Sequence, residues 1–238
     1  MVSRQELEKL RKQKIVLVGP SGTGKTYTAV QVAKTVSKKG KKVYYIDPEY
    51  GSEEELVKLS DDELKNIELV IPTNYEKFVN AVDNIPKDAS LVIVDGLSEI
   101  VNFRKLQIQK LLLTEGFFVD GKDEIQEIKS PETFTIPGRI YARIYLDLSS
   151  ILYDLISLPD IHVLMCMHPM ERQARGEVQE GIFRKADLVI QLTKTIEDNK
   201  PKWYGKVIKN RGKETETSEQ VYANPWMGLV KRFEQIIR

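Results

Sequence analysis

One segment, residues 19–26, constrains the fold of this chain more than any other. It fits the pattern G-x-x-x-x-G-K-[ST] in full, with the residues Gly19, Pro20, Ser21, Gly22, Thr23, Gly24, Lys25 and Thr26. The β-branched run 15–18 comes directly before it, and an apolar helical pattern runs from Lys25 until Gly40. A strand, a glycine-rich turn and a helix in this order predict a phosphate-binding loop (P-loop), because glycines let backbone N–H groups face the anion at the helix N-terminus.

Three residues have the chemistry of a magnesium nucleotide site. We expect Lys25 to reach the β- and γ-phosphates of ATP and the Thr26 hydroxyl to bind Mg²⁺. Asp95 ends the apolar run 91–94, which is where a Walker B carboxylate completes the metal site. An aspartate that only caps the following helix is the alternative. The sequence therefore predicts ATP and Mg²⁺ as ligands, with Thr26 and Asp95 as the metal residues.

Apolar runs alternate with amphipathic stretches along the chain. Strands are expected at 15–18, 43–46, 69–71, 91–95, 161–167 and 188–192, and again within 203–222. Strands that alternate with helices predict an α/β fold, a mainly parallel sheet with helices on both faces. A length of 238 residues suits a single domain.

Four segments complete this organisation. We expect a charged N-terminal helix over 1–13 and a final helix over 224–238. The region 114–136 has no periodicity, which indicates an insertion or a mobile loop. Residues 169–184 are rich in charge and are interpreted as a charged loop.

The composition excludes some classes of protein. The formal net charge of +1 argues against general nucleic-acid binding through overall basicity, so any such contact needs a local basic patch. The single cysteine, Cys166, lies in the apolar run 163–167, which favours a buried, reduced thiol. The apolar runs are too short to span a membrane, and the first residues are charged rather than signal-like. We expect a soluble, cytoplasmic protein with no membrane partner.

The catalytic base must lie apart from the Walker B strand, because Gly96 rather than glutamate follows Asp95. Glu49 is the candidate, since it comes just after the predicted strand 43–46. Parallel strands open on the same crevice at their carboxyl ends, so a carboxylate there can activate a water molecule. The alternative is that Asp47 and Glu49 only form a turn around Pro48.

The P-loop, Glu49 after the second strand and the Asp95–Gly96 pair together resemble the RecA core of P-loop ATPases. Within that group the compact length is similar to the RecA-like ATPases of phages and archaeal viruses that are linked to single-strand annealing and recombination. The resemblance implies a RecA-like domain and makes Glu49 the catalytic carboxylate.

Two further positions extend the resemblance. His168 follows the strand 163–167, where the family carries a polar γ-phosphate sensor that is most often glutamine; a polar residue at a strand end is the alternative. Lys209 and Arg211 lie in a segment similar to the family strand whose basic residues reach the ATP of a neighbouring subunit, and alternate residues of a strand share a face. The resemblance therefore implies catalytic roles for these residues and a homo-oligomer, either a ring or a filament.

The segment after His168 carries four basic residues, Arg172, Arg175, Arg184 and Lys185. In RecA-like proteins the corresponding loop contacts single-stranded DNA, and basic side chains on a mobile loop suit phosphate contact without sequence preference. The resemblance thus implies an ATPase that acts on single-stranded DNA in recombination or annealing. Interspersed glutamates also fit a solvated loop without DNA.

Other functions remain open at this stage. One is a KaiC-like regulatory ATPase that acts on a protein partner, and another is a DNA-packaging or translocating motor. A small-molecule kinase is a third, but it leaves Lys209 and Arg211 without a role. Trp203 and Trp226 are interpreted as core or interface anchors, and the sequence identifies no residue that stacks on the nucleotide base.

Overall fold

The computed structural model describes residues 12–115, 117–118, 125–126, 138–169, 174–211 and 221–237. The helix expected over 1–13 lies outside these residues except for its last two positions. Most of the segment 114–136 and the candidate DNA contact Arg172 also lie outside them.

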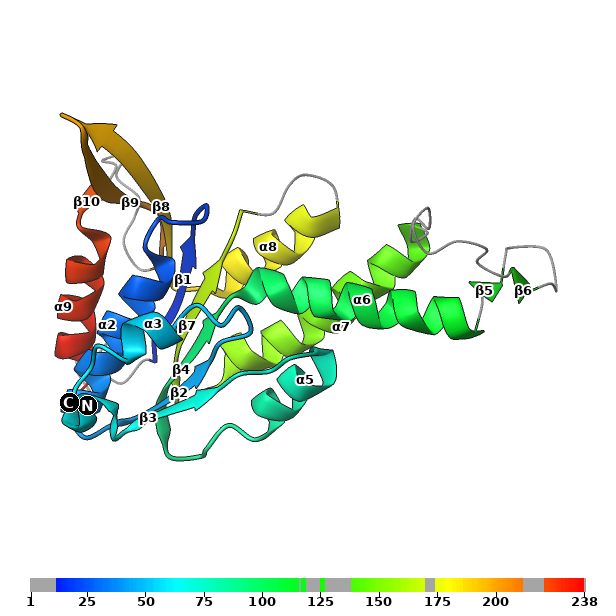
Figure 1. The fold of residues 1–238 in the computed structure, drawn as a ribbon, viewed down its shortest axis with the longest axis horizontal. Coiled ribbons are helices and arrows are strands. Elements are labelled where there is room, and N and C mark those ends of the chain that lie inside the picture. Colours follow the sequence, from blue (N-terminus) through cyan, green and yellow to red (C-terminus); the bar gives the residue numbers. More distant parts are fainter. Residues whose placement is uncertain are drawn as a thin grey trace, which may run out of the picture.

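An eight-stranded sheet forms the centre of the fold (Figure 1). Its strands are β1 (Lys14–Val18), β2 (Lys42–Ile46), β3 (Ile67–Val70), β4 (Ala89–Asp95), β7 (His162–Met167), β8 (Leu188–Glu197), β9 (Lys200–Asn210) and β10 (Val221–Ala223). They lie in the order β10-β9-β8-β1-β7-β4-β2-β3. The six strands from β8 to β3 are parallel, and β9 and β10 are antiparallel additions at one edge. The carboxyl ends of β1, β2, β4 and β7 therefore meet at one side of the sheet.

Helices cover both faces of the sheet, as Figure 1 shows. One face packs against α2 (Lys25–Lys38), α3 (Glu53–Leu56), the short α4 (Asp61–Leu64) and α9 (Pro225–Ile236). The other packs against α5 (Tyr75–Asp83), α6 (Leu97–Glu115), α7 (Gly138–Ser157) and α8 (Ala174–Lys185). Successive residues of a strand enter opposite cores: Ile15 and Leu17 of β1 face the first group, and Val16 and Val18 face the second. The predicted α/β fold is confirmed.

Two segments differ from the predictions. The charged loop expected over 169–184 contains a helix, α8, which starts at Ala174 and continues to Lys185. The strands expected within 203–222 start earlier, because β8 and β9 form a long hairpin that turns at Asp198 and Asn199, both with positive φ. Such a turn fits the right-handed twist of two antiparallel strands.

The helices α6 and α7 extend away from the sheet (Figure 1). The ion pair between Arg104 and Asp147 joins them. At the far end, β5 (Phe117–Phe118) pairs with β6 (Ile125–Gln126) in antiparallel fashion. The helix α6 ends at Glu115, so residues 114 and 115 of the segment 114–136 are helical, and the insertion or mobile loop expected there stays a prediction.

Candidate active site

The P-loop connects the end of β1 to the start of α2 and lines a cavity of about 550 Å³. Lys25 lies at the base of the loop, where its Nζ donates hydrogen bonds to the carbonyl oxygens of Gly19 and Pro20 at 2.8 and 2.9 Å. Burial lowers the pKa of Lys25, while the neighbouring Cys166, Glu49 and Asp95 act in the opposite direction. The loop thus holds the Lys25 ammonium group in place, and a bound phosphate group would replace the two carbonyls as its hydrogen-bond acceptor.

Asp95 lies at the carboxyl end of β4 and is almost completely buried. The Tyr45 hydroxyl of β2 donates to its Oδ2 at 2.9 Å, and the Thr26 hydroxyl also hydrogen-bonds to its carboxylate. Burial nevertheless raises the pKa of Asp95 to about 6. Tyr45 was not recognised in the sequence, where it is simply one residue of an apolar strand.

These oxygens fit a magnesium ion. A threonine hydroxyl and a carboxylate, hydrogen-bonded to each other, are hard oxygen donors of the kind that Mg²⁺ takes beside nucleotide phosphates. Thr26 and Asp95 are the residues that would hold it. Among the described residues, no group of three His, Cys, Asp or Glu side chains is arranged to hold a metal ion.

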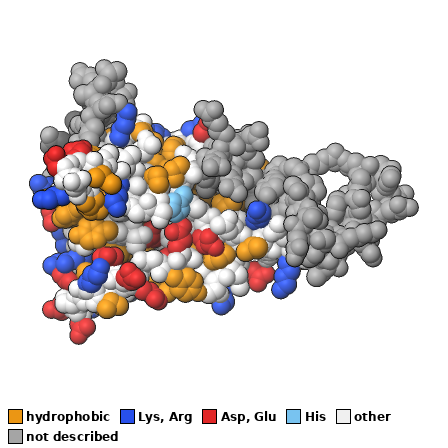
Figure 2. Space-filling model, turned by 45° about the horizontal axis from the view of Figure 1, so that its top comes forward, with side chains coloured by type: hydrophobic (Ala, Val, Ile, Leu, Met, Phe, Trp, Pro, Cys, Tyr) orange, Lys and Arg blue, Asp and Glu red, His pale blue; other side chains and the backbone are white. Residues whose placement is uncertain are grey.

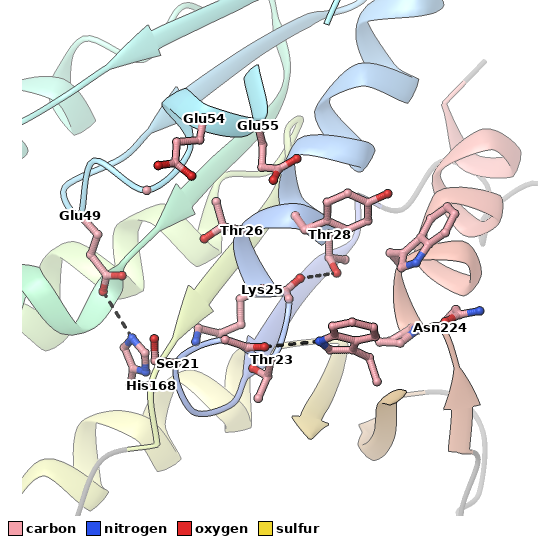
Figure 3. A pocket seen from close by; sticks show the side chains of 17 residues that line it. Ser21, Thr23, Lys25, Thr26, Thr28, Glu49, Glu54, Glu55, His168 and Asn224 are labelled. Carbon is pink, nitrogen blue, oxygen red and sulfur yellow. Dashed lines mark hydrogen bonds and ion pairs between the residues drawn. The ribbon is translucent and has the colours of Figure 1, made fainter. Parts of the chain in front are cut away.

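The two acidic residues of the loop after β2, Asp47 and Glu49, have different surroundings. Asp47 is fully buried and organises the turn: its carboxylate accepts from the backbone N–H of Glu49 at 3.1 Å and from the N–H and hydroxyl of Ser52 at 2.7 and 2.5 Å. Glu49 instead lines the cavity with the P-loop, as Figure 3 shows. Burial raises the pKa of Glu49, and Lys25 opposes that rise. Only Asp47 is used by the turn, so the Glu49 carboxylate is available to a water molecule.

The conformation and the neighbours of residue 96 explain why a glycine follows Asp95. Its φ is 116°, a conformation that favours glycine, and a Cβ atom built there would lie 2.5 Å from Cγ of Glu49. A side chain at position 96 and the side chain of Glu49 therefore compete for the same space. The absence of a glutamate next to Asp95 is therefore linked to the presence of Glu49 after β2, because the two side chains could not both fit.

His168 follows β7 and faces Glu49 across the cavity (Figure 3). Its Nε2 lies 3.8 Å from Oε1 of Glu49, and both side chains are about one-third exposed. Burial and the charge of Lys25 lower the pKa of His168. Its backbone N–H donates to the Ser98 hydroxyl at 2.9 Å, which fixes the strand end against the first turn of α6. Lys25, Glu49 and His168 are thus brought together from three strand ends.

Lys209 and Arg211 do not lie at this cavity. Lys209 Nζ donates to the carbonyl oxygens of Phe183 and Arg184 at 2.6 and 2.7 Å. Arg211 donates to the same Arg184 carbonyl at 2.8 Å and pairs with Asp187 at 3.6 Å. Within one chain these two cations hold the C-terminal end of α8, where helix carbonyls lack partners.

The basic residues proposed to contact DNA are partly engaged in the chain itself. Arg184 pairs with Glu180 at 3.3 Å one turn earlier on α8, and Lys185 lies 4.8 Å from the ring centroid of Tyr153. Arg175 is part of α8. The mobile loop expected to carry these residues is therefore a helix from Ala174 onward.

Both tryptophans line the cavity, contrary to their interpretation as core or interface anchors. Trp203 comes from β9 and Trp226 from the first turn of α9. Tyr27 of α2 and Asn224, the residue before α9, lie beside them. No local sequence pattern predicts that the two tryptophans line the cavity, because their position depends on where β9 and α9 pack relative to the P-loop.

Comparisons with known proteins agree with the fold. Residues 7–60, which include β1, the P-loop and Glu49, match the family model described as IstB-like ATP binding protein. No curated protein sequence matches the chain significantly. A KaiC-like protein from the archaeon Pyrococcus horikoshii is similar in structure, with a TM-score of 0.55 and 17% identity over 90% of this chain and 85% of that one. The flagellar accessory protein FlaH from Methanocaldococcus jannaschii gives 0.54 and 14% over 89% and 87%.

The chain has a RecA-like P-loop fold. The RecA-like core is thereby confirmed, whereas the link to the annealing ATPases of phages and archaeal viruses stays a prediction. In the part of the chain that the structure describes, no helix is both long and apolar enough to cross a membrane.

Proposed function

We propose that this protein binds MgATP and hydrolyses it. The observation that carries the proposal is the position of Glu49, which faces the P-loop from the end of β2 in space that Gly96 leaves open. A carboxylate beside a P-loop lysine supplies what a nucleotide-binding loop alone lacks, a base for the attacking water. The match of residues 7–60 to an ATP-binding family model supports ATP as the nucleotide.

Each residue then has a defined task. The P-loop backbone and Lys25 bind the phosphates, and Mg²⁺, when bound by Thr26 and Asp95, neutralises charge on the β- and γ-phosphates. Glu49 accepts the proton of the attacking water, and its raised pKa makes it a stronger base than an exposed glutamate. His168, 3.8 Å from Glu49, orients that carboxylate and senses the γ-phosphate.

The finer proposal is that the active site is completed in a homo-oligomer, a ring or a filament. Lys209 and Arg211 would reach the ATP of the neighbouring subunit and stabilise charge in the transition state. Both lie at the end of β9 and bind the last carbonyls of α8. Contact with a neighbour's phosphates would require them to exchange those carbonyls for a stronger, doubly charged ligand.

The work done by hydrolysis is proposed to be on single-stranded DNA, in recombination or annealing. A second candidate is a regulatory ATPase that acts on a protein partner, as in KaiC-like proteins. One observation favours it: Arg184 and Lys185, two of the four candidate DNA contacts, already have partners in Glu180 and Tyr153. Basic groups that are paired within the chain add less to phosphate binding than free ones.

The test is the ATPase rate as a function of protein concentration, with and without single-stranded DNA. We expect the rate per subunit to rise with concentration and with DNA. Glu49→Gln should lower turnover by about 10²- to 10⁴-fold, the usual contribution of a general base. Glu53→Gln, at an exposed glutamate in the first turn of α3 that does not line the cavity, is the matched control and should leave turnover unchanged.

The outcomes test the ATPase activity, the role of DNA and the catalytic base separately. If Glu49→Gln is inactive but DNA has no effect on rate or assembly, the ATPase stands and the partner is a protein. A preference for duplex over single-stranded DNA would favour a packaging or translocating motor. Full activity of Glu49→Gln would contradict the assignment of the base.

A further inference from the structure

The cavity at the P-loop has two chemically different ends. The phosphate-binding end consists of the P-loop, Glu49 and His168. The aromatic end consists of three rings, Tyr27, Trp203 and Trp226. A cavity of about 550 Å³ is in the size range of small-molecule sites and is larger than phosphate groups alone require. The aromatic end is therefore suited to bind a planar, apolar group of a ligand.

Tyr27 and Trp226 form a corner at this end. Their ring centroids are 5.8 Å apart and their planes are nearly perpendicular, at 88°. Tyr27 is 38% exposed, and Trp226 is partly exposed, so neither ring is covered by the protein core. A planar ligand ring that stacks on one of them meets the other edge to face, and both arrangements are favourable for aromatic systems.

Trp203 has a different task. Its indole N–H donates to the carbonyl oxygen of Gly22 in the P-loop at 3.3 Å. Lys194 Nζ lies 5.6 Å from its ring centroid. We interpret Trp203 as a positioning residue that ties β9 to the P-loop, beside the corner rather than within it.

The scaffold around the corner fixes Trp226. The backbone N–H of Asn224 donates to the carbonyl of Trp203 at 3.2 Å, so the chain enters α9 directly beside β9. Pro225 then packs on Gly205, where a Cβ atom would lie 2.7 Å from Cβ of Pro225. Only a residue without a side chain allows this approach. Trp226 is thus held next to α2 by contacts that no phosphate-binding role requires.

We propose that the Tyr27–Trp226 corner stacks the base of the bound nucleotide and makes the site select purine over pyrimidine nucleotides. This rests on the proposed function, because it takes the phosphates to lie on the P-loop. Tyr27 directly follows Thr26, so the corner is within the length of one nucleotide from the phosphate site. A purine presents a larger ring face than a pyrimidine and gains more from stacking.

The first test compares ATP with tripolyphosphate, which carries the phosphates without a base. Binding of each is measured by calorimetry for the unchanged protein and for Trp226→Leu. We expect Trp226→Leu to weaken ATP binding by about tenfold or more, as removal of a stacking aromatic does, and to leave tripolyphosphate binding unchanged. Trp226→Phe should recover most of the affinity. The matched control is Met227→Leu, an exposed neighbour that does not line the cavity, and it should bind both ligands normally.

The second test is spectroscopic. The chain has two tryptophans, so the part of the fluorescence change that the unchanged protein shows and Trp226→Phe lacks reports on Trp226. We expect ATP and GTP to quench its fluorescence, CTP to bind more weakly, and tripolyphosphate to have little effect.

Each contrary result has a distinct meaning. Binding of ATP without any change at Trp226, or CTP binding as tight as ATP binding, overturns the stacking proposal and leaves the ATPase intact. Equal loss of ATP and tripolyphosphate in Trp226→Leu also overturns it, since the ring would then only shape the P-loop. If the unchanged protein binds neither ligand, the proposed function itself fails.

Discussion

At the scale of single residues, the carboxyl group of Asp95 lies where its charge is disfavoured. Its pKa of about 6 exceeds the ordinary value of a free aspartate, so the native state binds this proton more tightly than the unfolded chain. The free energy of unfolding should therefore fall as the pH rises from about 4 to about 6, and it should stay low above that. Above pH 6 the folded protein carries an unfavourable buried charge.

Asp95→Asn removes that charge, and its effect should depend on pH. We expect the variant to exceed the unchanged protein in free energy of unfolding by roughly 3 kcal/mol at pH 7.5, with the difference disappearing near pH 4. Urea denaturation at the two pH values measures this, and the exposed Asp154→Asn reports the effect of net charge alone. A stability difference that is the same at both pH values would contradict the assigned pKa. ATPase activity should be lost in Asp95→Asn, because the carboxylate is a proposed metal ligand.

Gly96 allows a sharper separation of activity from stability. Gly96→Ala and Gly40→Ala both place a side chain at positive φ, but only the former meets other atoms, those of Glu49. Since a glutamate side chain can rotate away, the clash should displace the base rather than unfold the protein. We expect backbone strain to lower stability by about 1 to 2 kcal/mol in Gly40→Ala and by more in Gly96→Ala, whose φ lies beyond the left-handed helical region, and turnover to fall at least about tenfold only in Gly96→Ala. Similar turnover in the two variants would show that Glu49 does not depend on the space at position 96.

At the scale of elements, α8 depends on residues far away in the sequence. Lys209 and Arg211 bind its last carbonyls from β9. We expect Lys209→Met to lower stability by about 1 kcal/mol and to accelerate amide hydrogen exchange in the last turn of α8. Lys200→Met, an exposed lysine at the other end of β9, should change neither. If exchange in α8 stays slow in Lys209→Met, the lysine does not hold the helix.

The same contacts explain what could be predicted from the sequence and what could not. The core strands and α2 were predictable, because the hydrophobic period of a strand or helix is a local property of the sequence. The helix α8 is polar, contains Gly176 and Gly181, and is stabilised at its end by cations that follow some 25 residues later. A local pattern favours a loop there, because glycine and charge lower helix propensity. The tertiary contact outweighs that propensity.

At the scale of the whole molecule, the candidate site was predictable to the extent that it depends on strand ends. Lys25, Glu49, Asp95 and His168 all follow or end parallel strands, and parallel strands bring such residues to one crevice. Tyr45, Trp203 and Trp226 were missed for the opposite reason. Their roles come from side-chain neighbours across the sheet and from the packing of α9 on α2, which no spacing in the sequence encodes.

Whether Lys209 and Arg211 act on a neighbouring subunit can be decided by mixing inactive variants. Glu49→Gln lacks the base but keeps both cations, and a Lys209→Ala/Arg211→Ala double variant keeps the base but lacks the cations. In a random equimolar mixture, about a quarter of the sites combine an intact base with a neighbour that supplies the cations. We therefore expect each variant alone to be nearly inactive and the mixture to recover roughly that fraction of the normal ATPase rate.

The matched control for this experiment is a mixture of Glu49→Gln with Lys25→Ala. Glu49→Gln lacks the base and Lys25→Ala lacks the phosphate-binding lysine. Both residues act within their own subunit, so no pairing of subunits can restore turnover. The double variant is expected to be less stable, because the same two cations hold α8, so its thermal midpoint must be shown to lie well above the assay temperature. Without recovery in the test mixture, or with full activity of the double variant alone, the shared active site is wrong. The function of Lys209 and Arg211 is then the one they have within a single chain, which is to anchor the end of α8 to β9.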